Sequence, residues 1–217
     1  MATFTARDLT LRPVAVVRIL GIDPGTQVVG YGCLEVTVGA ARVAEDGAPL
    51  AMRGSNVVRV GAAGEGGVRL VDAGVLRLGG RSVDLCDRLV RLCDRFAELL
   101  RELRPSEVAI EEAFFGKSVQ AALRIGEARG VVLAQAKKSG LDVFQYAPAR
   151  VKRTVTGHGA ARKESVASML GQLLPAGALA AVGELPADAT DAVAVAWTRL
   201  EERRSPLAAH RRAHGPG

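Results

Sequence analysis

The segment Gly21-Ile22-Asp23-Pro24-Gly25-Thr26 is the main indication of the fold of this 217-residue chain. It places one carboxylate between an apolar run and a tight turn. Residues 14–21 predict a buried strand, and residues 28–38 predict a second one. Pro24-Gly25 favours a turn between them, so the chain is expected to open with a β-hairpin. Asp23 then lies at the end of a buried strand, where an Asp forms a turn as often as it binds a ligand.

Three more acidic residues lie beside apolar segments far along the chain. Glu111 follows a short apolar run, and Asp188 and Asp191 open the last apolar stretch. Carboxylates at the ends of buried elements repel one another unless a cation lies between them, and a divalent metal is the simplest candidate. Two alternatives stay open. Asp188 and Asp191 also suit the first turn of a helix, where they would interact with the helix dipole. Glu111 and Glu112 are both candidates for the acid that faces Asp23, and only one of them can do so, because neighbours on a strand face opposite sides.

The net charge of +6 is concentrated in one segment. Residues 117–163 contain ten Lys or Arg and two acidic residues, a balance of 10 − 2 = +8. A basic field beside an acidic centre favours a polyanionic substrate, although solvated surface charge is the simpler interpretation. No stretch approaches the roughly 20 apolar residues of a membrane span. The first residues lack the layout of a secretion signal, so we expect a cytoplasmic protein.

Helices and strands are expected to alternate after the hairpin. Residues 39–80 are rich in Gly, and short alternating pieces at 57–60 and 68–78 leave open edge strands or a flexible excursion. Ser82 is suited to cap a helix that Pro105 ends, and Ser118 one that Gly140 ends. The remaining expected elements are strands at 107–111 and 143–146 and helices from 148, at 162–174 and at 187–203. This order predicts an α/β fold with a mixed central sheet flanked by helices.

The helix expected after Ser118 carries small residues at every fourth position, namely Ala122, Gly126, Gly130 and Ala134. This spacing leaves one face of the helix nearly without side chains. Such a face permits another helix to approach closely. The approaching helix can come from within the fold or from a second subunit, and the sequence does not choose between them.

Taken together, these segments resemble the RuvC family of Holliday junction resolvases from about Arg18 to Leu200. The resemblance rests on Leu20-Gly21-Ile22-Asp23-Pro24-Gly25-Thr26, Gly30-Tyr31-Gly32, Ala109-Ile110-Glu111, Phe114, residues 122–130, Val151-Lys152 and Ala187-Asp188-Ala189-Thr190-Asp191-Ala192. It implies an RNase H-like fold, a homodimer, a branch-migration helicase as partner, and symmetric nicking of four-way DNA junctions that leaves 5′-phosphates.

The resemblance also assigns roles to individual residues. The four metal-binding acids of the family fall on Asp23, Glu111, Asp188 and Asp191. Two Mg²⁺ ions per active site are implied, with Mn²⁺ as a substitute, and hard oxygen ligands without paired Cys or His agree with this. One ion is expected to lower the pKa of the attacking water, while the other stabilises the leaving oxygen.

The basic residues near the family's active site fall on Lys152 and Lys163, and Lys163 is also expected to stabilise charge that develops during the reaction. Lys117 and Arg153 are further expected DNA contacts. The aromatic residue that the family inserts at the junction centre falls on Phe114, where an exposed ring can stack on unpaired bases.

Three segments are expected from these patterns: an N-terminal extension at 1–17, a nuclease domain at 18–203 with an expanded Gly-rich connection at about 40–80, and a basic tail at 204–217. The extension is expected to be flexible and the tail disordered. Two other functions remain: an RNase H-like nuclease for another nucleic acid, and a junction-binding protein without activity. The hairpin also resembles that of sugar kinases and actin, but those proteins need a second domain for which 217 residues leave no room.

Overall fold

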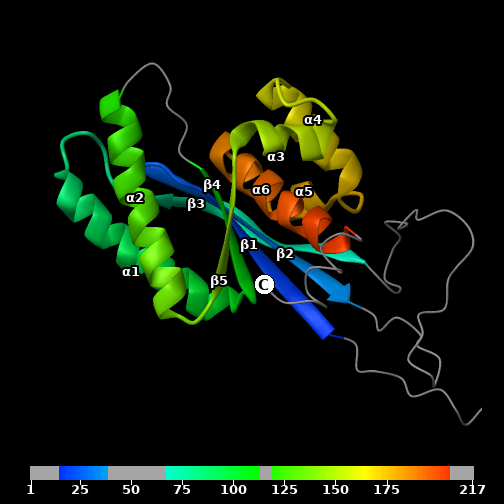
Figure 1. Ribbon diagram of the computed structural model, residues 1–217, viewed down its shortest axis with the longest axis horizontal. Coiled ribbons are helices and arrows are strands. Elements are labelled where there is room, and N and C mark those ends of the chain that lie inside the picture. Colours follow the sequence, from blue (N-terminus) through cyan, green and yellow to red (C-terminus); the bar gives the residue numbers. More distant parts are fainter. Residues whose placement is uncertain (1–14, 39–66, 113–118, 206–217) are drawn as a thin grey trace, which may run out of the picture.

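A five-stranded mixed sheet forms the centre of the protein (Figure 1). The computed structural model describes residues 15–38, 67–112 and 119–205. The strands are ordered β3-β2-β1-β4-β5. Their bounds are Ala15–Asp23 for β1, Val28–Val38 for β2, Val68–Arg77 for β3, Glu107–Glu111 for β4 and Asp142–Tyr146 for β5. β1 to β3 are antiparallel neighbours, whereas β4 runs parallel to both β1 and β5, which is the mixed sheet that the sequence predicts.

Helices cover both faces of this sheet (Figure 1). α1 (Leu85–Leu103) and α2 (Val119–Lys138) lie on one face. The other face carries α3 (Pro148–Thr156), α4 (Lys163–Leu173), α5 (Ala178–Ala181) and α6 (Ala187–Arg204). The result is a three-layered α/β domain of the RNase H-like kind. No described helix is long and apolar enough to cross a membrane.

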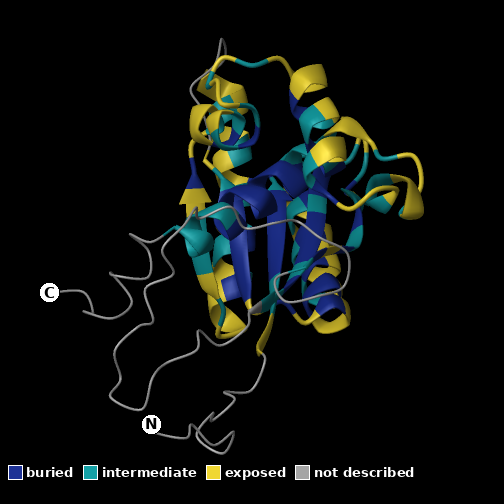
Figure 2. Cartoon of the chain, turned by 90° about the vertical axis from the view of Figure 1, so that its right-hand side faces the viewer, coloured by how far each residue is buried: buried dark blue, intermediate teal, exposed yellow. Residues whose placement is uncertain are grey.

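Strand alternation divides the interior into two cores. On β1, Leu20 and Ile22 pack with α1 and α2, while Ile19 faces α6. On β4, Val108 and Ile110 belong to the first of these cores and the residue between them to the second. Because these strands are covered on both faces, their sequences read as continuous apolar runs rather than alternating ones. Figure 2 shows the buried strands at the centre of the molecule.

α6 lies directly on the sheet because glycines replace side chains at the contact. A Cβ atom on Gly21 would lie 2.1 Å from the carbonyl oxygen of Ala192, and one on Gly30 would lie 1.9 Å from that of Asp188. Gly32 faces the backbone of Val193 in the same way. Glycine is therefore required at these positions for close approach, and the approach fixes the height of α6 above β1 and β2.

Several expected boundaries are confirmed and others are wrong. The strands at 28–38 and 107–111 have the predicted bounds, and β3 confirms an edge strand near 68–78. Asp84, not Ser82, caps α1, because its side chain accepts a 2.8 Å hydrogen bond from the Cys86 amide directly before the first helical turn. The short helix α5 was not predicted.

The expected segment limits also change slightly. β1 begins at Ala15, so residues 15–17 belong to the sheet and not to a flexible extension. α6 ends at Arg204, one residue later than the expected end of the domain. The strand piece at 57–60, the cap at Ser118, and the greater part of both expected termini lie outside the described residues.

Candidate active site

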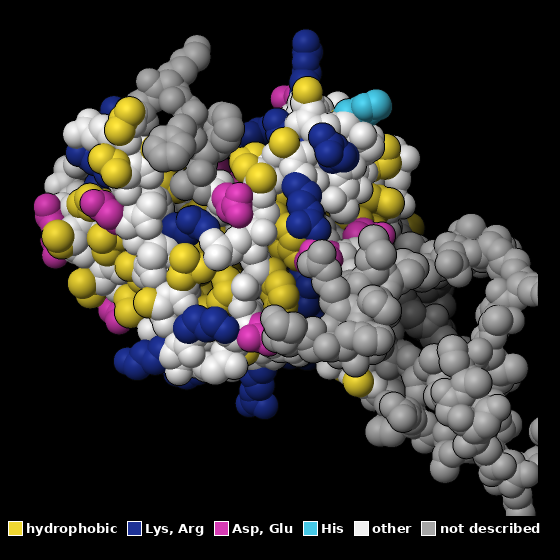
Figure 3. Space-filling model, viewed as in Figure 1, with side chains coloured by type: hydrophobic (Ala, Val, Ile, Leu, Met, Phe, Trp, Pro, Cys, Tyr) yellow, Lys and Arg dark blue, Asp and Glu magenta, His cyan; other side chains and the backbone are white. Residues whose placement is uncertain are grey.

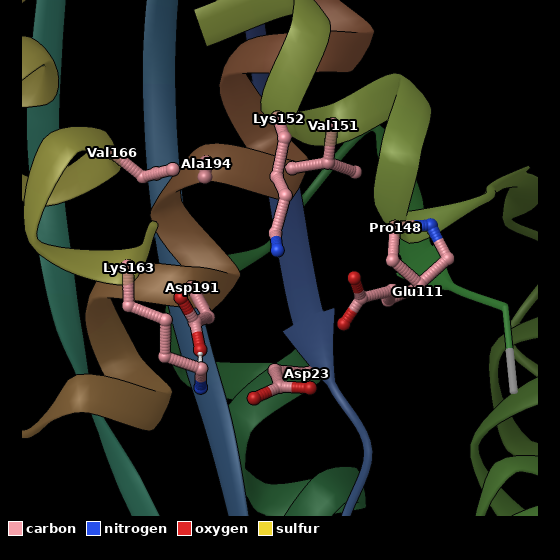
Figure 4. Close-up of a pocket in the computed structure, with 9 residues that line it drawn as sticks. All are labelled: Asp23, Glu111, Pro148, Val151, Lys152, Lys163, Val166, Asp191 and Ala194. Carbon is pink, nitrogen blue, oxygen red and sulfur yellow. Dashed lines mark hydrogen bonds and ion pairs between the residues drawn. The ribbon is translucent and has the colours of Figure 1, made fainter. Parts of the chain in front are cut away.

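A pocket of about 230 Å³ opens where the ends of β1 and β4 meet α3, α4 and α6 (Figure 4). It brings together three of the four predicted metal ligands and both predicted lysines. Its lining consists of Asp23, Glu111, Pro148, Val151, Lys152, Lys163, Val166, Asp191 and Ala194. Residues that are up to 171 positions apart in the chain, 194 − 23, thus share one cavity.

The strand register places the first two carboxylates next to each other. β1 and β4 are parallel neighbours, and Ile22 pairs with Ile110 in their ladder. The next residue on each strand is the acidic one, so Asp23 and Glu111 end their strands at the same edge of the sheet. Parallel strands separated by about 4.8 Å hold such side chains close together.

The first two turns of α6 supply the other two carboxylates. Asp188 and Asp191 are three residues apart and share one side of the helix. Asp191 lines the pocket, whereas Asp188 is half-buried beside it, within electrostatic reach of Asp23. The contact between Gly30 and the Asp188 carbonyl holds this end of α6 against the sheet.

Glu112 does not face the pocket. Its side chain is exposed, and its amide donates a 2.9 Å hydrogen bond to the carbonyl of Tyr146 on β5. The choice between Glu111 and Glu112 is therefore decided in favour of Glu111 as the pocket residue, for the reason that strand alternation gives.

Crowding and burial of the carboxylates disfavour their charged forms. Burial, and after it the charges of Glu111, Asp191 and Asp188 in that order, together raise the pKa of Asp23 to about 8. Burial also raises the pKa of Glu111, and the charge of Asp191 adds to this. Like charges in one desolvated cavity cannot all ionise without a compensating cation. The site therefore favours the binding of a cation.

Two lysines supply part of that charge from separate helices. Lys163, at the start of α4, forms a hydrogen-bonded ion pair with Asp191, which raises the pKa of the lysine. Lys152 of α3 reaches the same cavity (Figure 4). Arg153 is exposed and does not line the pocket, so the structure does not place it with the other two. Phe114 and Lys117 lie outside the described residues.

Acidic and basic side chains also lie close together on the molecular surface. On the face shown in Figure 3, an acidic side chain near the centre of the described surface lies among several Lys and Arg side chains. In the sequence, the strongly basic segment 117–163 lies between Glu111 and Asp188. Such a surface attracts phosphates toward a centre that itself attracts cations.

The donors in the pocket fit a hard divalent cation. The acidic lining residues offer only carboxylate oxygens, and no Cys or His is among the described residues that line the cavity. Oxygen donors of this kind are the ligands that hard cations such as Mg²⁺ and Mn²⁺ prefer. Within residues 15–38, 67–112 and 119–205, no three acidic, Cys or His side chains converge closely enough to hold one ion. Lys163 stands beside Asp191 in this arrangement.

The apolar walls of the pocket were not predicted from the sequence. Pro148, Val166 and Ala194 form them together with Val151. Helical spacing could have predicted Ala194 as a pocket residue, because it follows Asp191 by three residues on α6 and so lies on the same face of the helix. No comparable signal marks Val166, which comes from a different helix.

Comparisons with known proteins agree on one family. The family model for crossover junction endodeoxyribonuclease RuvC matches residues 48–199, a span that contains Glu111, Asp188 and Asp191 and begins after Asp23. RuvC of Halorhodospira halophila is 38% identical over 88% of this chain and 95% of its own. RuvC of Chlorobium phaeovibrioides is 37% identical over 84% of this chain and 80% of its own.

A solved structure extends the agreement to three dimensions. T. thermophilus RuvC in complex with Holliday junction substrate superposes with a TM-score of 0.64 at 30% identity, covering 87% of this chain and 95% of that one. Fold and sequence thus point the same way. The chain belongs to the RuvC family of crossover junction endodeoxyribonucleases.

Proposed function

We propose that this protein resolves Holliday junctions by metal-dependent nicking of two opposed DNA strands. One observation carries the proposal: carboxylates from β1, β4 and α6 meet in a single pocket that lysines from α3 and α4 also enter. Acidic groups that hold a metal beside basic groups that hold phosphate are the arrangement that phosphodiester hydrolysis requires. The junction-bound relative from T. thermophilus supports the choice of substrate.

We propose that Asp23, Glu111, Asp188 and Asp191 hold Mg²⁺, with two ions per site. The fit rests on the all-oxygen donors and on the raised pKa values of Asp23 and Glu111, which a bound cation would relieve. When bound, such ions activate a water molecule for attack and stabilise the leaving oxygen.

The remaining pocket residues bind and orient the substrate. Lys152 and Lys163, which line the pocket from α3 and α4, contact phosphate oxygens, and Asp191 holds the Lys163 ammonium through their ion pair. The apolar walls, which include Val151 and Val166, exclude bulk water and so strengthen these charge interactions. Arg153, Lys117 and Phe114 remain proposed DNA contacts on the strength of the family resemblance.

We further propose that the protein acts as a homodimer joined through α2. The small-residue face of this helix has no partner among the described residues, since nothing lies within 4 Å of a Cβ built on Gly126 or Gly130. Val119 and Leu123 beside it are 67% and 63% exposed. A second copy of α2 can cover this face, and the resulting two-fold axis would match a junction with two equivalent strands. A branch-migration helicase as partner stays a prediction from the resemblance.

A cleavage assay tests the proposed function. Purified protein is mixed with a synthetic mobile four-way junction and with linear duplex of the same sequence, in Mg²⁺ with or without EDTA. We expect paired nicks in the junction alone, and their disappearance with EDTA. Equal cutting of the linear duplex would favour a nuclease of the same fold with another substrate, and binding without any cutting would favour a junction-binding protein.

Asp23→Asn supplies the matched control for this assay. Removing one ligand charge weakens metal binding more than it weakens the phosphate contacts of the lysines, so the variant should bind the junction normally and fail to cut it. Loss of junction binding by Asp23→Asn would contradict this division between metal-binding and phosphate-binding residues.

A further inference from the structure

A buried ionic cluster lies outside the pocket, at the opposite end of β4. Glu107 begins this strand, and its side chain is 6% exposed. Arg199 of α6, 8% exposed, donates two hydrogen bonds to it, of 3.0 and 2.9 Å, in a bidentate pair. Arg203, one turn further along α6, donates a third of 2.9 Å. Such paired bonds fix direction as well as distance.

The cluster extends to two further elements. The Arg199 guanidinium lies over the Phe144 ring of β5, 3.3 Å from its centroid, and donates to Glu202 at 3.1 Å. The Glu202 carboxylate accepts hydrogen bonds from the Tyr146 hydroxyl of β5 and from Arg150 of α3. The cluster therefore connects β4, β5, α3 and α6. Three of these elements carry residues of the pocket.

The two ends of the β4–α6 contact match in length. Glu107 and Glu111 are four residues apart on a strand, which corresponds to about 13 Å. Asp191 and Arg199 are eight residues apart on a helix, which corresponds to about 12 Å. The Glu107–Arg199 ion pair therefore lies at one end of this contact, and the carboxylates of Glu111 and Asp191 lie at the other. α6 runs antiparallel to β4.

The apolar contact between α6 and the sheet combines small and large residues. Ala192 and Ala196 face Gly21, and Trp197 is buried in the same core. This contact is close-packed but carries no directional bond to β4. The bidentate ion pair adds one, because a shift of about 1.5 Å along the helix axis, the rise of one residue, breaks both hydrogen bonds.

We propose that Arg199 and Glu107 are positioning residues that set the axial position of α6, and with it the approach of Asp191 to Glu111. The inference rests on the proposed metal-dependent function of the pocket. Neither residue touches substrate, and both act through the carboxylates at the other end of their elements. Buried ion pairs contribute little net stability compared with apolar residues, and fixing of register is their best-attested role.

The test compares Arg199→Lys with two controls. Lysine keeps the charge but cannot make the planar bidentate pair. Glu201→Gln removes an ion pair with Arg204 that stays within α6 and does not reach β4. Leu92→Ala destabilises the fold by truncating a fully buried residue of α1, in the core on the other face of the sheet from the cluster.

Three quantities are measured for each variant: Mn²⁺ binding by calorimetry, single-turnover cleavage of the junction at saturating DNA, and fluorescence of the single tryptophan, Trp197. This residue lies on α6 two positions before Arg199 and is 2% exposed, so its emission reports the packing of the helix. We expect Arg199→Lys to lower Mn²⁺ affinity and the cleavage rate at least tenfold and to shift the emission, with unchanged junction affinity. Both controls should keep wild-type Mn²⁺ affinity and rate.

Wild-type Mn²⁺ affinity in Arg199→Lys would overturn the inference. An equal loss of affinity in Leu92→Ala would overturn it as well, since it would trace the effect to general instability. If Arg199→Lys does not fold, the double variant Glu107→Leu with Arg199→Met replaces the pair by apolar residues, and it should fold but bind Mn²⁺ at least tenfold more weakly. A wild-type protein that binds Mn²⁺ without cutting junctions would refute the proposed function and leave the positioning test intact.

Discussion

Replacing Asp23 by Asn should stabilise the metal-free protein at pH 8, although it removes a proposed metal ligand. Burial and three neighbouring carboxylates raise the pKa of Asp23 from 3.8 to about 8. The folded protein therefore holds a proton at this site that the unfolded chain releases above about pH 4. The contribution of Asp23 to stability is fully present below pH 3.8, falls as pH rises, and is lost once pH reaches about 8.

The size of the effect follows from the same shift. A difference of about 4 pKa units corresponds to a loss of about 6 kcal/mol between pH 4 and 8, which is an upper bound for a half-buried group. An Asn amide that lacks hydrogen-bond partners in the pocket destabilises the variant by about 1–3 kcal/mol, which offsets part of this gain. We therefore expect Asp23→Asn to raise the free energy of unfolding at pH 8 by about 3 kcal/mol, and to change it little or to lower it at pH 4.

Urea unfolding in EDTA at pH 4, 6 and 8 measures this difference. Asp142→Asn is the matched control, because that side chain is 78% exposed and its ion pair with Lys137 is screened by solvent. Added Mg²⁺ should stabilise the wild type and not Asp23→Asn, since only a ligand-binding native state gains by mass action. A variant that is less stable than the wild type at pH 8 in EDTA would refute the electrostatic reasoning.

Three further predictions concern the architecture of the site and its contacts with DNA. Gly30→Ala should cost about 3 kcal/mol of stability and most of the cleavage activity, because its Cβ would lie 1.9 Å from the Asp188 carbonyl oxygen. The control Gly171→Ala, where α4 leaves room for a Cβ, should not lower the melting temperature. Lys163→Ala should lower the single-turnover cleavage rate about a hundredfold with little change in Mg²⁺ dependence, and an unaltered rate would exclude a role in charge stabilisation. Phe114→Ala should slow cutting of fully paired junctions more than of junctions with unpaired centres, which a side-by-side gel assay measures; equal rates would contradict base stacking.

Much of the fold could be predicted because local rules act over a few residues. The apolar run that ends at Asp23 and the Pro24-Gly25 turn predict the β1–β2 hairpin, and the bounds of β2 and β4 are as expected. Helix caps were less secure, since Ser82 and Asp84 are both good capping residues and only the backbone path selects Asp84. The positions of the four acids beside buried segments predict where the site lies, and Asp23, Glu111 and Asp191 line the pocket.

Most strands and helices, and the acidic residues beside them, could be predicted from the residues alone, because periodicity, turn chemistry and charge are local properties. Which of these residues meet depends on how the chain packs. Lys163 reaches Asp191 across 28 positions, and Arg199 reaches Glu107 across 92. Both contacts depend on the strand order β3-β2-β1-β4-β5 and on glycines that let α6 rest on the sheet. Those are properties of the packed chain, since they arise from surfaces that exist only after distant segments come together.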